Sequence, residues 1–282
     1  MLYLVPGGAG FIGSNLAEAL VARGDQVRVL DNFSAGKKQN LRFPGSERVE
    51  IIEADIRDLR ACRDATRGVQ VVFHEAALGS VPRSVADPGE THDVNVTGTL
   101  NMLIAARDEA VSRFVFASSS SIYGDRPCPD DERCEAKRET MTRTPLSPYG
   151  VSKLAAEEYC RVFSSLYGCE IVSLRYFNVF GPRQSHVSEY AAVIPRFIRT
   201  LLSGHRPVVY GDGGQSRDFT FVGDVVRANL LAATVPGIAG ESFNVACGRR
   251  HSLLDLLENL RAITGIKVEP CFEKPRAGDI RH

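Results

Sequence analysis

Two residues four positions apart, Tyr149 and Lys153, have the types and spacing for proton-transfer chemistry. Ser147 and Pro148 precede them and mark the start of a helix, so the phenol and the ammonium share one helical face. A tyrosine ionises near pH ~10, and ionisation near neutrality requires roughly 4 kcal/mol of stabilisation. A nearby ammonium and a positive cofactor ring can supply it, which would make Tyr149 a general base. The same spacing also arises by chance, so the pair needs support from the rest of the sequence.

A run of four serines, Ser118–Ser121, is the second polar feature with catalytic chemistry. It follows an apolar, strand-like stretch, 113–117. In open parallel sheets, ligands bind at the carboxyl ends of the strands. The serines alone could equally form a polar turn, but their order relative to Tyr149 and the motifs below favours a ligand site.

A glycine cluster after the first apolar stretch predicts a phosphate-binding loop. The sequence Gly-Gly-Ala-Gly-Phe-Ile-Gly occupies positions 7–13 and satisfies both GxGxxG and GxxGxxG. Glycine leaves the backbone N–H groups accessible at the positive end of a helix, where they can bind a pyrophosphate. We expect the cofactor contacts of this loop to come from Gly7, Gly10, Phe11, Ile12 and Gly13.

Asp31, which ends the second strand-like stretch, predicts the kind of dinucleotide. Its carboxylate can accept hydrogen bonds from two ribose hydroxyls and would repel a 2′-phosphate, so NAD is favoured over NADP. Arg28 lies inside the strand and is not placed to reverse this preference. Asp55 and Ile56 follow the third strand and are expected to form the wall beside the adenine.

Strand-like and helix-like stretches alternate through the first two thirds of the chain, as in a parallel sheet covered on both faces. The predicted strands are 2–5, 26–30, 49–53, 69–74, 113–117 and 170–174. The predicted helices are 12–23, 58–66, 93–108 and 148–167. This pattern predicts an α/β fold with a Rossmann-type, doubly wound parallel sheet.

The pattern loosens after residue 176 and predicts a smaller α/β lobe that binds the substrate. We expect an NAD-binding Rossmann domain over 1–176 and the substrate lobe over 177–282. The stretch 219–245 resembles a strand, turn and helix that return to the main sheet, so the two parts would be interleaved. No helix or strand is completed after Pro275, which is typical of a chain whose C-terminal end is missing.

Charge, cysteines and hydropathy exclude several classes of protein. The 282 residues include 34 basic and 34 acidic side chains, so the net charge favours neither a nucleic acid nor an anionic membrane as partner. The seven cysteines form no CxxC pair, and we predict no metal site. The N-terminus lacks a signal peptide's basic segment, and no stretch reaches the ~18 apolar residues of a membrane span. We expect a cytoplasmic protein with reduced thiols.

Ordered motifs across almost the whole chain resemble the NAD-dependent epimerase/dehydratase family of extended short-chain dehydrogenases/reductases. They include GGAGFIGSNLAEAL, HEAALGSVPRSVADP, SSSSIYGD, SPYGVSKLAAE, LRYFNVFGPRQ and GDGGQSRDFTFVGDV. Within this family the chain is most similar to the UDP-N-acetylglucosamine and UDP-glucose 4-epimerases. One departure is Pro6, which replaces the usual threonine before the glycines.

The resemblance implies a catalytic role for three residues. Ser119 would relay a proton, Tyr149 would be the base, and Lys153 would orient the nicotinamide ribose and lower the pKa of the tyrosine. Removal of the sugar 4′-OH proton, with hydride transfer to NAD, would give a 4-keto sugar. Return of the hydride to its other face would invert C4, and NAD would stay bound. We also assign Asn32, Ala76 and Ala77 to the cofactor site.

The resemblance also implies a UDP-sugar as substrate. An arginine fork suits phosphate oxygens, and two arginines of this chain match the residues that hold the diphosphate. The matching residues are Asn178, Arg217 and Arg276 for the phosphates, Asp279 for the uridine or its ribose, and Ala192 and Val193 for the wall around the nucleotide.

Ser120 and Ser121 bear on the reaction. Dehydratases of this family carry an Asp-Glu pair at these positions to expel water, whereas serine has no useful acidity. Dehydration is therefore disfavoured, and decarboxylation is disfavoured less decisively.

Gly79, where hexose-only epimerases often have a lysine, leaves room for an N-acetyl group together with Ser80 and Ala192. Such room does not exclude the smaller hexose, and the discriminating position, 283, lies beyond this sequence.

Two other interpretations of the site remain open. One is a UDP-sugar decarboxylase or a reductase of a 4-keto sugar, although a reductase should release its cofactor and usually prefers NADP. The other is a non-catalytic NAD-binding protein, because a fold alone does not establish activity. An intact set of Ser119, Tyr149 and Lys153 argues against the second interpretation.

Two predicted helices bear on oligomeric state. The stretches 93–108 and 148–167 resemble the pair that forms a four-helix dimer interface in this family. Packing against the sheet would explain their periodicity equally well. We expect a homodimer.

Overall fold

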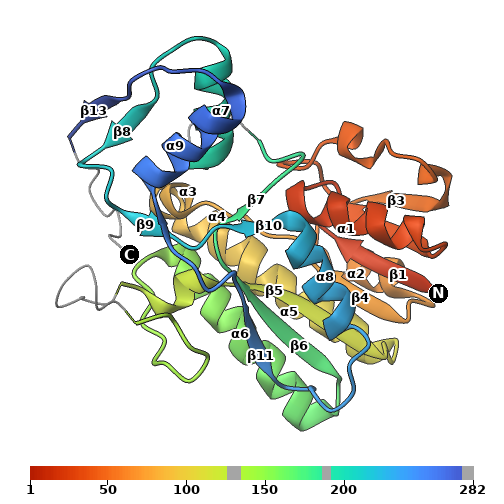
Figure 1. Ribbon diagram of the computed structural model, residues 1–282. Coiled ribbons are helices and arrows are strands. Elements are labelled where there is room, and N and C mark those ends of the chain that lie inside the picture. Colours follow the sequence, from red (N-terminus) through yellow and green to blue (C-terminus); the bar gives the residue numbers. More distant parts are fainter. Residues whose placement is uncertain (126–134, 186–191, 275–282) are drawn as a thin grey trace.

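The computed structural model describes residues 1–125, 135–185 and 192–274 and is built around a seven-stranded sheet (Figure 1). All strand pairs in this sheet are parallel, in the order β11-β6-β5-β4-β1-β2-β3. The strands are β1 (Leu2–Pro6), β2 (Gln26–Asp31), β3 (Val49–Glu53), β4 (Val71–His74), β5 (Arg113–Ser119), β6 (Ile171–Tyr176) and β11 (Ser242–Val245). The winding reverses between β1 and β4, where sheets of this kind bind ligands. The predicted doubly wound Rossmann-type sheet is confirmed.

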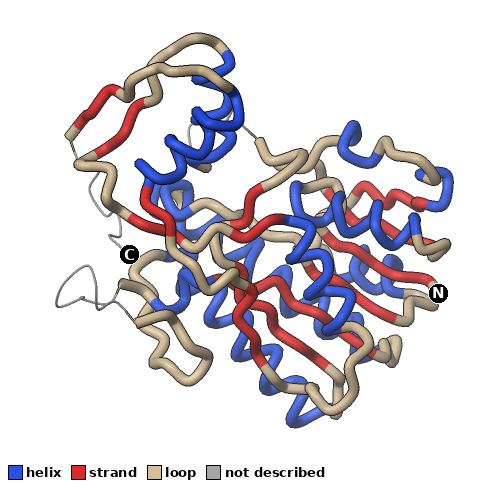
Figure 2. Tube along the Cα trace, in the orientation of Figure 1, coloured by secondary structure: helices blue, strands red, loops and turns tan. Residues whose placement is uncertain are grey.

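Helices cover both faces of the sheet (Figure 2). Helices α1 (Phe11–Ala22) and α8 (Val222–Ala232) pack on one face, and α2 (Leu59–Thr66), α5 (Gly98–Asp108) and α6 (Pro148–Tyr167) pack on the other. Because helices cover both faces, all four residues of β4 and all seven of β5 are buried. This burial on both faces explains why the central strands are so rich in apolar residues. In the described part of the chain, none of the helices combines the length and hydropathy of a membrane span.

The helix predicted over 93–108 is interrupted near its start. Residues Asp93–Thr97 form a π-helical turn, η3, and α5 begins at Gly98. The wide turn buries the Asn95 side chain, which accepts a hydrogen bond from the Leu78 N–H at 2.8 Å and donates one to the Ser152 hydroxyl at 3.0 Å. Asn95 therefore joins the loop after β4 to α6, which explains why the regular helix gives way here.

The predicted start of the fourth strand is two residues too early. Val69 is apolar and buried, but its N–H donates to the Thr66 carbonyl at 3.1 Å and closes the turn after α2. Gly68, with φ +70°, makes that turn possible. Strand β4 therefore begins at Val71.

A smaller group of elements lies at the upper left of Figure 1, with its own apolar core. Its helices are α7 (Val193–Leu202) and α9 (Leu253–Thr264), and β8 (Val208–Tyr210) pairs with β13 (Cys271–Glu273). Two short strand pairs connect this group to the rest of the fold. They are β9 (Ser216–Arg217) with β12 (His251–Ser252), and β7 (Val179–Phe180) with β10 (Thr220–Phe221), which lies beside α8 in the centre of Figure 1. Two elements from this part of the sequence belong to the main sheet instead: α8 packs against it, and β11 forms its edge strand. The division of the chain at 176/177 stays a prediction.

Candidate active site

The glycine loop between β1 and α1 is packed so closely that side chains are excluded. Gly7 has φ +79°, and a Cβ there would lie 2.5 Å from the backbone nitrogen of Ala76, just after β4. A Cβ at Gly13 would lie 2.4 Å from the Gly7 carbonyl oxygen. Gly10 differs, because a Cβ there would meet only that same oxygen, at 3.1 Å, and Gly10 lines a cavity. The N-terminus of α1 is thus open to the cavity, where its dipole favours a phosphate.

A cavity runs from this loop along the ends of β2, β3 and β4. It contains most of the residues that the sequence assigned to NAD. Its lining includes Gly7, Gly10, Asp31, Asn32, Asp55, Ile56, Ala76 and Ala77.

Asp31 is buried at the end of β2, and backbone amides hold both of its oxygens. The Ala9 N–H donates to Oδ2 at 2.9 Å, and the Phe33 N–H donates to Oδ1 at 2.8 Å. Burial raises the pKa of Asp31, while these two hydrogen bonds oppose the shift. Each carboxylate oxygen retains a further lone pair, so Asp31 can still accept hydrogen bonds from ribose hydroxyls in the cavity.

Arg57 was missed by the sequence reasoning, although it lines the same cavity. Its guanidinium pairs with the Asp55 carboxylate at 2.7 Å and lowers the pKa of that carboxyl to about 2. The Asn32 amide donates to Asp55 at 2.8 Å. The three side chains form a fixed polar rim where an adenosine could be held.

Ser119, Tyr149 and Lys153 line a second, larger cavity of about 860 Å³. The Ser119 hydroxyl donates to Ser121 Oγ at 3.1 Å. Burial raises the pKa of Tyr149, and the Ser119 hydroxyl opposes that shift. The phenol still needs a positive charge nearby to ionise at neutral pH.

Lys153, four residues further along α6, is a buried lysine that lines the same cavity. The residue is 3% exposed, and its Nζ donates to the Ala117 carbonyl at 2.7 Å and lies 5.0 Å from the centre of the Phe116 ring. Burial lowers the pKa of Lys153 to about 8, and the charge of Glu75 opposes this shift. The ammonium form therefore predominates at pH 7.

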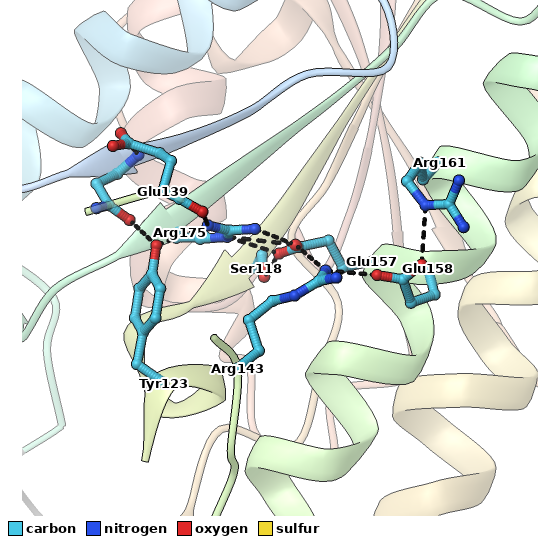
Figure 3. A network of polar contacts seen from close by, with 9 residues as sticks. Ser118, Tyr123, Glu139, Arg143, Glu157, Glu158, Arg161 and Arg175 are labelled. Atoms are coloured by element: carbon cyan, nitrogen blue, oxygen red, sulfur yellow. Dashed lines mark hydrogen bonds and ion pairs between the residues drawn. The ribbon is translucent and has the colours of Figure 1, made fainter. Parts of the chain in front are cut away.

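A buried ion pair anchors the helix that carries Tyr149 and Lys153 (Figure 3). Glu157 of α6 and Arg175 of β6 are 2% and 4% exposed, and Arg175 Nη2 lies 2.6 Å from Glu157 Oε1. The Ser118 hydroxyl, next to Ser119 in β5, donates to Glu157 Oε2 at 2.6 Å. One carboxylate thus links the strand that ends at Ser119 with the helix that carries Tyr149 and Lys153.

The same network reaches the far side of the site through Tyr123, at the end of the 3₁₀ turn η4 (Ser120–Tyr123). Arg175 Nη1 donates to the Tyr123 hydroxyl at 2.6 Å, and that hydroxyl donates to Asn244 of β11 at 2.7 Å. Arg143 adds a second cation, 3.3 Å from Glu157. Tyr123, which ends the turn after the serine run, is therefore held by residues of both β6 and β11.

The structure brings most, but not all, of the predicted substrate residues to this cavity. Val193 packs into the apolar core of α7 and α9, and Arg217 lies on β9, where its guanidinium donates to the Ser216 carbonyl at 2.8 Å. Neither belongs to the described lining of the cavity. Arg276 and Asp279 lie outside the described residues. The predicted residues that line it are Gly79, Ser80, Ser120, Ser121, Asn178 and Ala192, with Phe11, Ile12 and Gly13 from the glycine loop.

The cavity also contains charged residues that the sequence reasoning did not single out. Arg83 and Arg183 line it, and Arg183 is held by a 2.6 Å ion pair with Glu18 of α1. Glu75 lies where β4 ends, and its carboxylate accepts a hydrogen bond from Tyr176 at 2.7 Å. A carboxylate directly after a buried strand was the available signal for Glu75.

This combination of sheet, glycine loop and Tyr-Lys helix places the chain in the NAD-dependent epimerase/dehydratase family, whose sequence model matches residues 3–246. The family predicted from the motifs is confirmed, and with it NAD as the cofactor that the glycine loop fits.

Known proteins of this family are similar over nearly the whole chain. UDP-N-acetylglucosamine 4-epimerase from Methanobrevibacter ruminantium M1, in complex with UDP-N-acetylmuramic acid, is 39% identical with a TM-score of 0.93, over 99% of this chain and 87% of that one. UDP-glucose 4-epimerase from Thermus thermophilus, in complex with NAD, is 39% identical with a TM-score of 0.89, over 100% of this chain and 89% of that one. UDP-glucose 4-epimerase from Mycolicibacterium smegmatis is 38% identical, over 100% of this chain and 88% of its own length.

Replacing Gly10 with alanine tests the glycine loop. Gly10→Ala is expected to fold, because the new methyl group meets one atom, but to bind NAD at least about tenfold more weakly, a loss of ~1.4 kcal/mol. Calorimetric titration of NAD into cofactor-stripped protein measures the change. Gly79→Ala is the matched control, since a Cβ at Gly79 meets nothing within 4 Å. Wild-type affinity in Gly10→Ala would contradict a pyrophosphate at this loop.

Removing the buried carboxylate tests the network of Figure 3. Glu157→Ala leaves the Arg175 guanidinium buried without its partner and is expected to lower the free energy of unfolding by about 3–5 kcal/mol. Glu158→Ala, next to it on α6 and more exposed, should cost less than about 1 kcal/mol. Urea unfolding followed by circular dichroism compares them, and equal losses would mean that the buried pair does not anchor α6.

Proposed function

We propose that this protein is a UDP-sugar 4-epimerase that inverts C4 of UDP-N-acetylglucosamine and UDP-N-acetylgalactosamine, with UDP-glucose and UDP-galactose as further substrates. The observation that carries the proposal is the convergence of Ser119, Tyr149 and Lys153 on one cavity with serines at 120 and 121. Relatives named as UDP-sugar 4-epimerases support the reaction class.

Each of the three residues has a defined task in this reaction. NAD, when bound, accepts a hydride from the sugar and returns it within the same turnover. The Tyr149 phenolate takes the proton of the 4-hydroxyl, and the Ser119 hydroxyl, which lines the same cavity, relays that proton. The Lys153 ammonium favours the phenolate by its charge. Tyr149 gives the proton back to the opposite epimer after the 4-keto sugar has turned.

The serines after Ser119 separate epimerisation from dehydration. Expulsion of water across C5 and C6 requires an acid and a base beside the sugar. Ser120 and Ser121 have neither property, and the Ser121 hydroxyl accepts a hydrogen bond from Ser119 at 3.1 Å. We infer that their role is to position the catalytic serine and to leave the 4-keto sugar otherwise unreacted.

The cavity can accommodate the nucleotide part of the substrate. Arg83 and Arg183 line it and offer planar donors to phosphate oxygens. Asn178 and Ala192 line it as the resemblance implied, and they are proposed contacts of the UDP group. Val193, Arg217, Arg276 and Asp279 stay predicted contacts of the same group.

A second copy of the chain is the proposed partner. Helix α6 is buried against the sheet on one side and exposes apolar side chains on the other. Val151, Tyr159, Leu166 and Tyr167 are all exposed. Helix α5 packs beside α6 in the same layer, so the pair can present a continuous face to its symmetry mate.

The epimerase activity is tested by proton NMR. UDP-N-acetylglucosamine and UDP-glucose are incubated separately with the protein and no added reductant. New anomeric signals of the galacto epimer are expected in both, because NAD is regenerated in each turnover. No new signal in either, with NAD shown to be bound, would contradict C4 epimerisation of these substrates. UDP-glucuronate is then the next substrate, as a test for decarboxylation.

A lysine at position 79 tests the N-acetyl preference. A Cβ at Gly79 faces open space within the cavity, so Gly79→Lys is compatible with the fold. Its side chain should fill the N-acetyl space and lower kcat/KM for UDP-N-acetylglucosamine, relative to UDP-glucose, by about tenfold or more. Gly79→Ala is the control and should preserve the ratio. An unchanged ratio in Gly79→Lys would mean that the N-acetyl group binds elsewhere.

A further inference from the structure

Two aspartates, Asp31 and Asp55, lie at the ends of neighbouring strands and line the cofactor cavity. Asp31 is the last residue of β2, and Asp55 follows β3 by two residues. A carboxylate can bind a ligand only with lone pairs that the protein leaves open, and it has about four lone-pair sites. The donors that each aspartate already accepts therefore show what each can offer to a cofactor.

Asp31 has open sites on both of its oxygens. Oδ2 accepts one hydrogen bond, from the Ala9 N–H at 2.9 Å, and Oδ1 accepts one, from the Phe33 N–H at 2.8 Å. Each oxygen keeps a lone pair for a ligand, which suits a carboxylate that binds ribose hydroxyls.

Asp55 differs, because donors of the protein occupy both of its oxygens twice. Oδ1 accepts hydrogen bonds from the backbone N–H of Arg57 at 2.8 Å and from its Nε at 3.0 Å. Oδ2 accepts hydrogen bonds from Arg57 Nη2 at 2.7 Å and from the Asn32 amide at 2.8 Å. The lone-pair sites of this carboxylate are therefore filled before any cofactor binds.

The turn that carries Arg57 is held by the two helices beside it. The Asn101 amide of α5 donates to the Ile56 carbonyl at 3.0 Å and to the Arg57 carbonyl at 2.9 Å. The Cys62 thiol of α2 also donates to the Ile56 carbonyl, at 3.2 Å. These contacts fix the backbone on both sides of the pair, so Arg57 stays in position to bind Asp55 with two parallel N–H groups.

The hydrogen-bonding groups of adenine can be compared with this rim of the cavity. The exocyclic amino group of adenine is a donor, and its ring nitrogens are acceptors. An amino group is recognised by an open acceptor, whereas a guanidinium has only donors. The Arg57 guanidinium also lowers the pKa of Asp55 to about 2, so the carboxylate has no proton of its own to donate. The rim therefore suits the ring nitrogens of a base and not its amino group.

We propose that Arg57 is a specificity-determining residue of the cofactor site: together with Asn32 it occupies the Asp55 carboxylate, so the adenine amino group of NAD is not recognised. The dinucleotide is then selected through its ribose by Asp31 and through its pyrophosphate by the glycine loop. This inference concerns the binding of NAD and does not depend on which sugar reaction follows.

The test compares two cofactors on the same protein. Cofactor-stripped protein is titrated calorimetrically with NAD and with the analogue whose base is purine, which lacks only the 6-amino group and keeps the ring nitrogens. The wild-type protein is expected to bind both with Kd values within about threefold of each other. Binding of the analogue that is weaker by more than this would overturn the proposal, because an acceptor would then recognise the amino group.

Removing the Arg57 side chain should create the recognition that the wild-type protein lacks. Arg57→Ala frees one site on each Asp55 oxygen, and the side chain is 43% exposed, so the variant is expected to fold. NAD should then bind about tenfold more tightly than the purine analogue, since the freed carboxylate can accept from the amino group. Equal Kd values in Arg57→Ala would overturn the role of Arg57.

Two further variants identify the acceptor. Adding Asp55→Ala to Arg57→Ala should abolish the preference for NAD, and a preference that survives would overturn the assignment to Asp55. Arg63→Ala is the matched control, because Arg63 is similarly exposed and pairs with Asp108 but does not belong to the described lining of the cavity. Its ratio of the two Kd values should equal that of the wild-type protein, and a changed ratio would mean that loss of any nearby arginine alters base selection.

Discussion

The site depends on keeping one ammonium charged where little water reaches it. Lys153 is 3% exposed, and an unpaired buried charge costs several kcal/mol. Helix α6 delivers the amine, and β5 provides the contacts that compensate its charge. The Ala117 carbonyl accepts a hydrogen bond from Nζ at 2.7 Å, and the centre of the Phe116 ring lies 5.0 Å from Nζ.

The rest of the architecture holds these elements at fixed distances. The buried pair of Glu157 and Arg175 fixes α6 against β6, and Ser118 ties the same carboxylate to β5. On the other side of the switch point, the missing side chain of Gly7 lets β1 end against the residues that follow β4. The cofactor cavity and the larger cavity thus share part of their lining, which includes Gly7, Gly10 and Glu75.

The features that could be predicted from the sequence are those set by local signals. Helix α6 has its predicted bounds because Ser147 caps its start and Gly168, in the left-handed region, follows its end. The sheet and the glycine loop follow from similar patterns. Contacts between distant positions could not be predicted, such as that of Glu75 with Tyr176, 101 residues away. The short strands around α7 and α9 also depend on distant pairing, and Arg217 lies on one of them.

The proposed mechanism requires that a hydride leaves C4 of the sugar and returns to the same carbon within one turnover. The decisive measurement is the fate of deuterium placed at C4 of UDP-N-acetylglucosamine, followed by NMR and mass spectrometry during conversion in ordinary water. If the mechanism holds, the deuterium remains at C4 in both epimers and C5 does not exchange with solvent. Loss of the deuterium to solvent, or exchange at C5 during inversion, would contradict it.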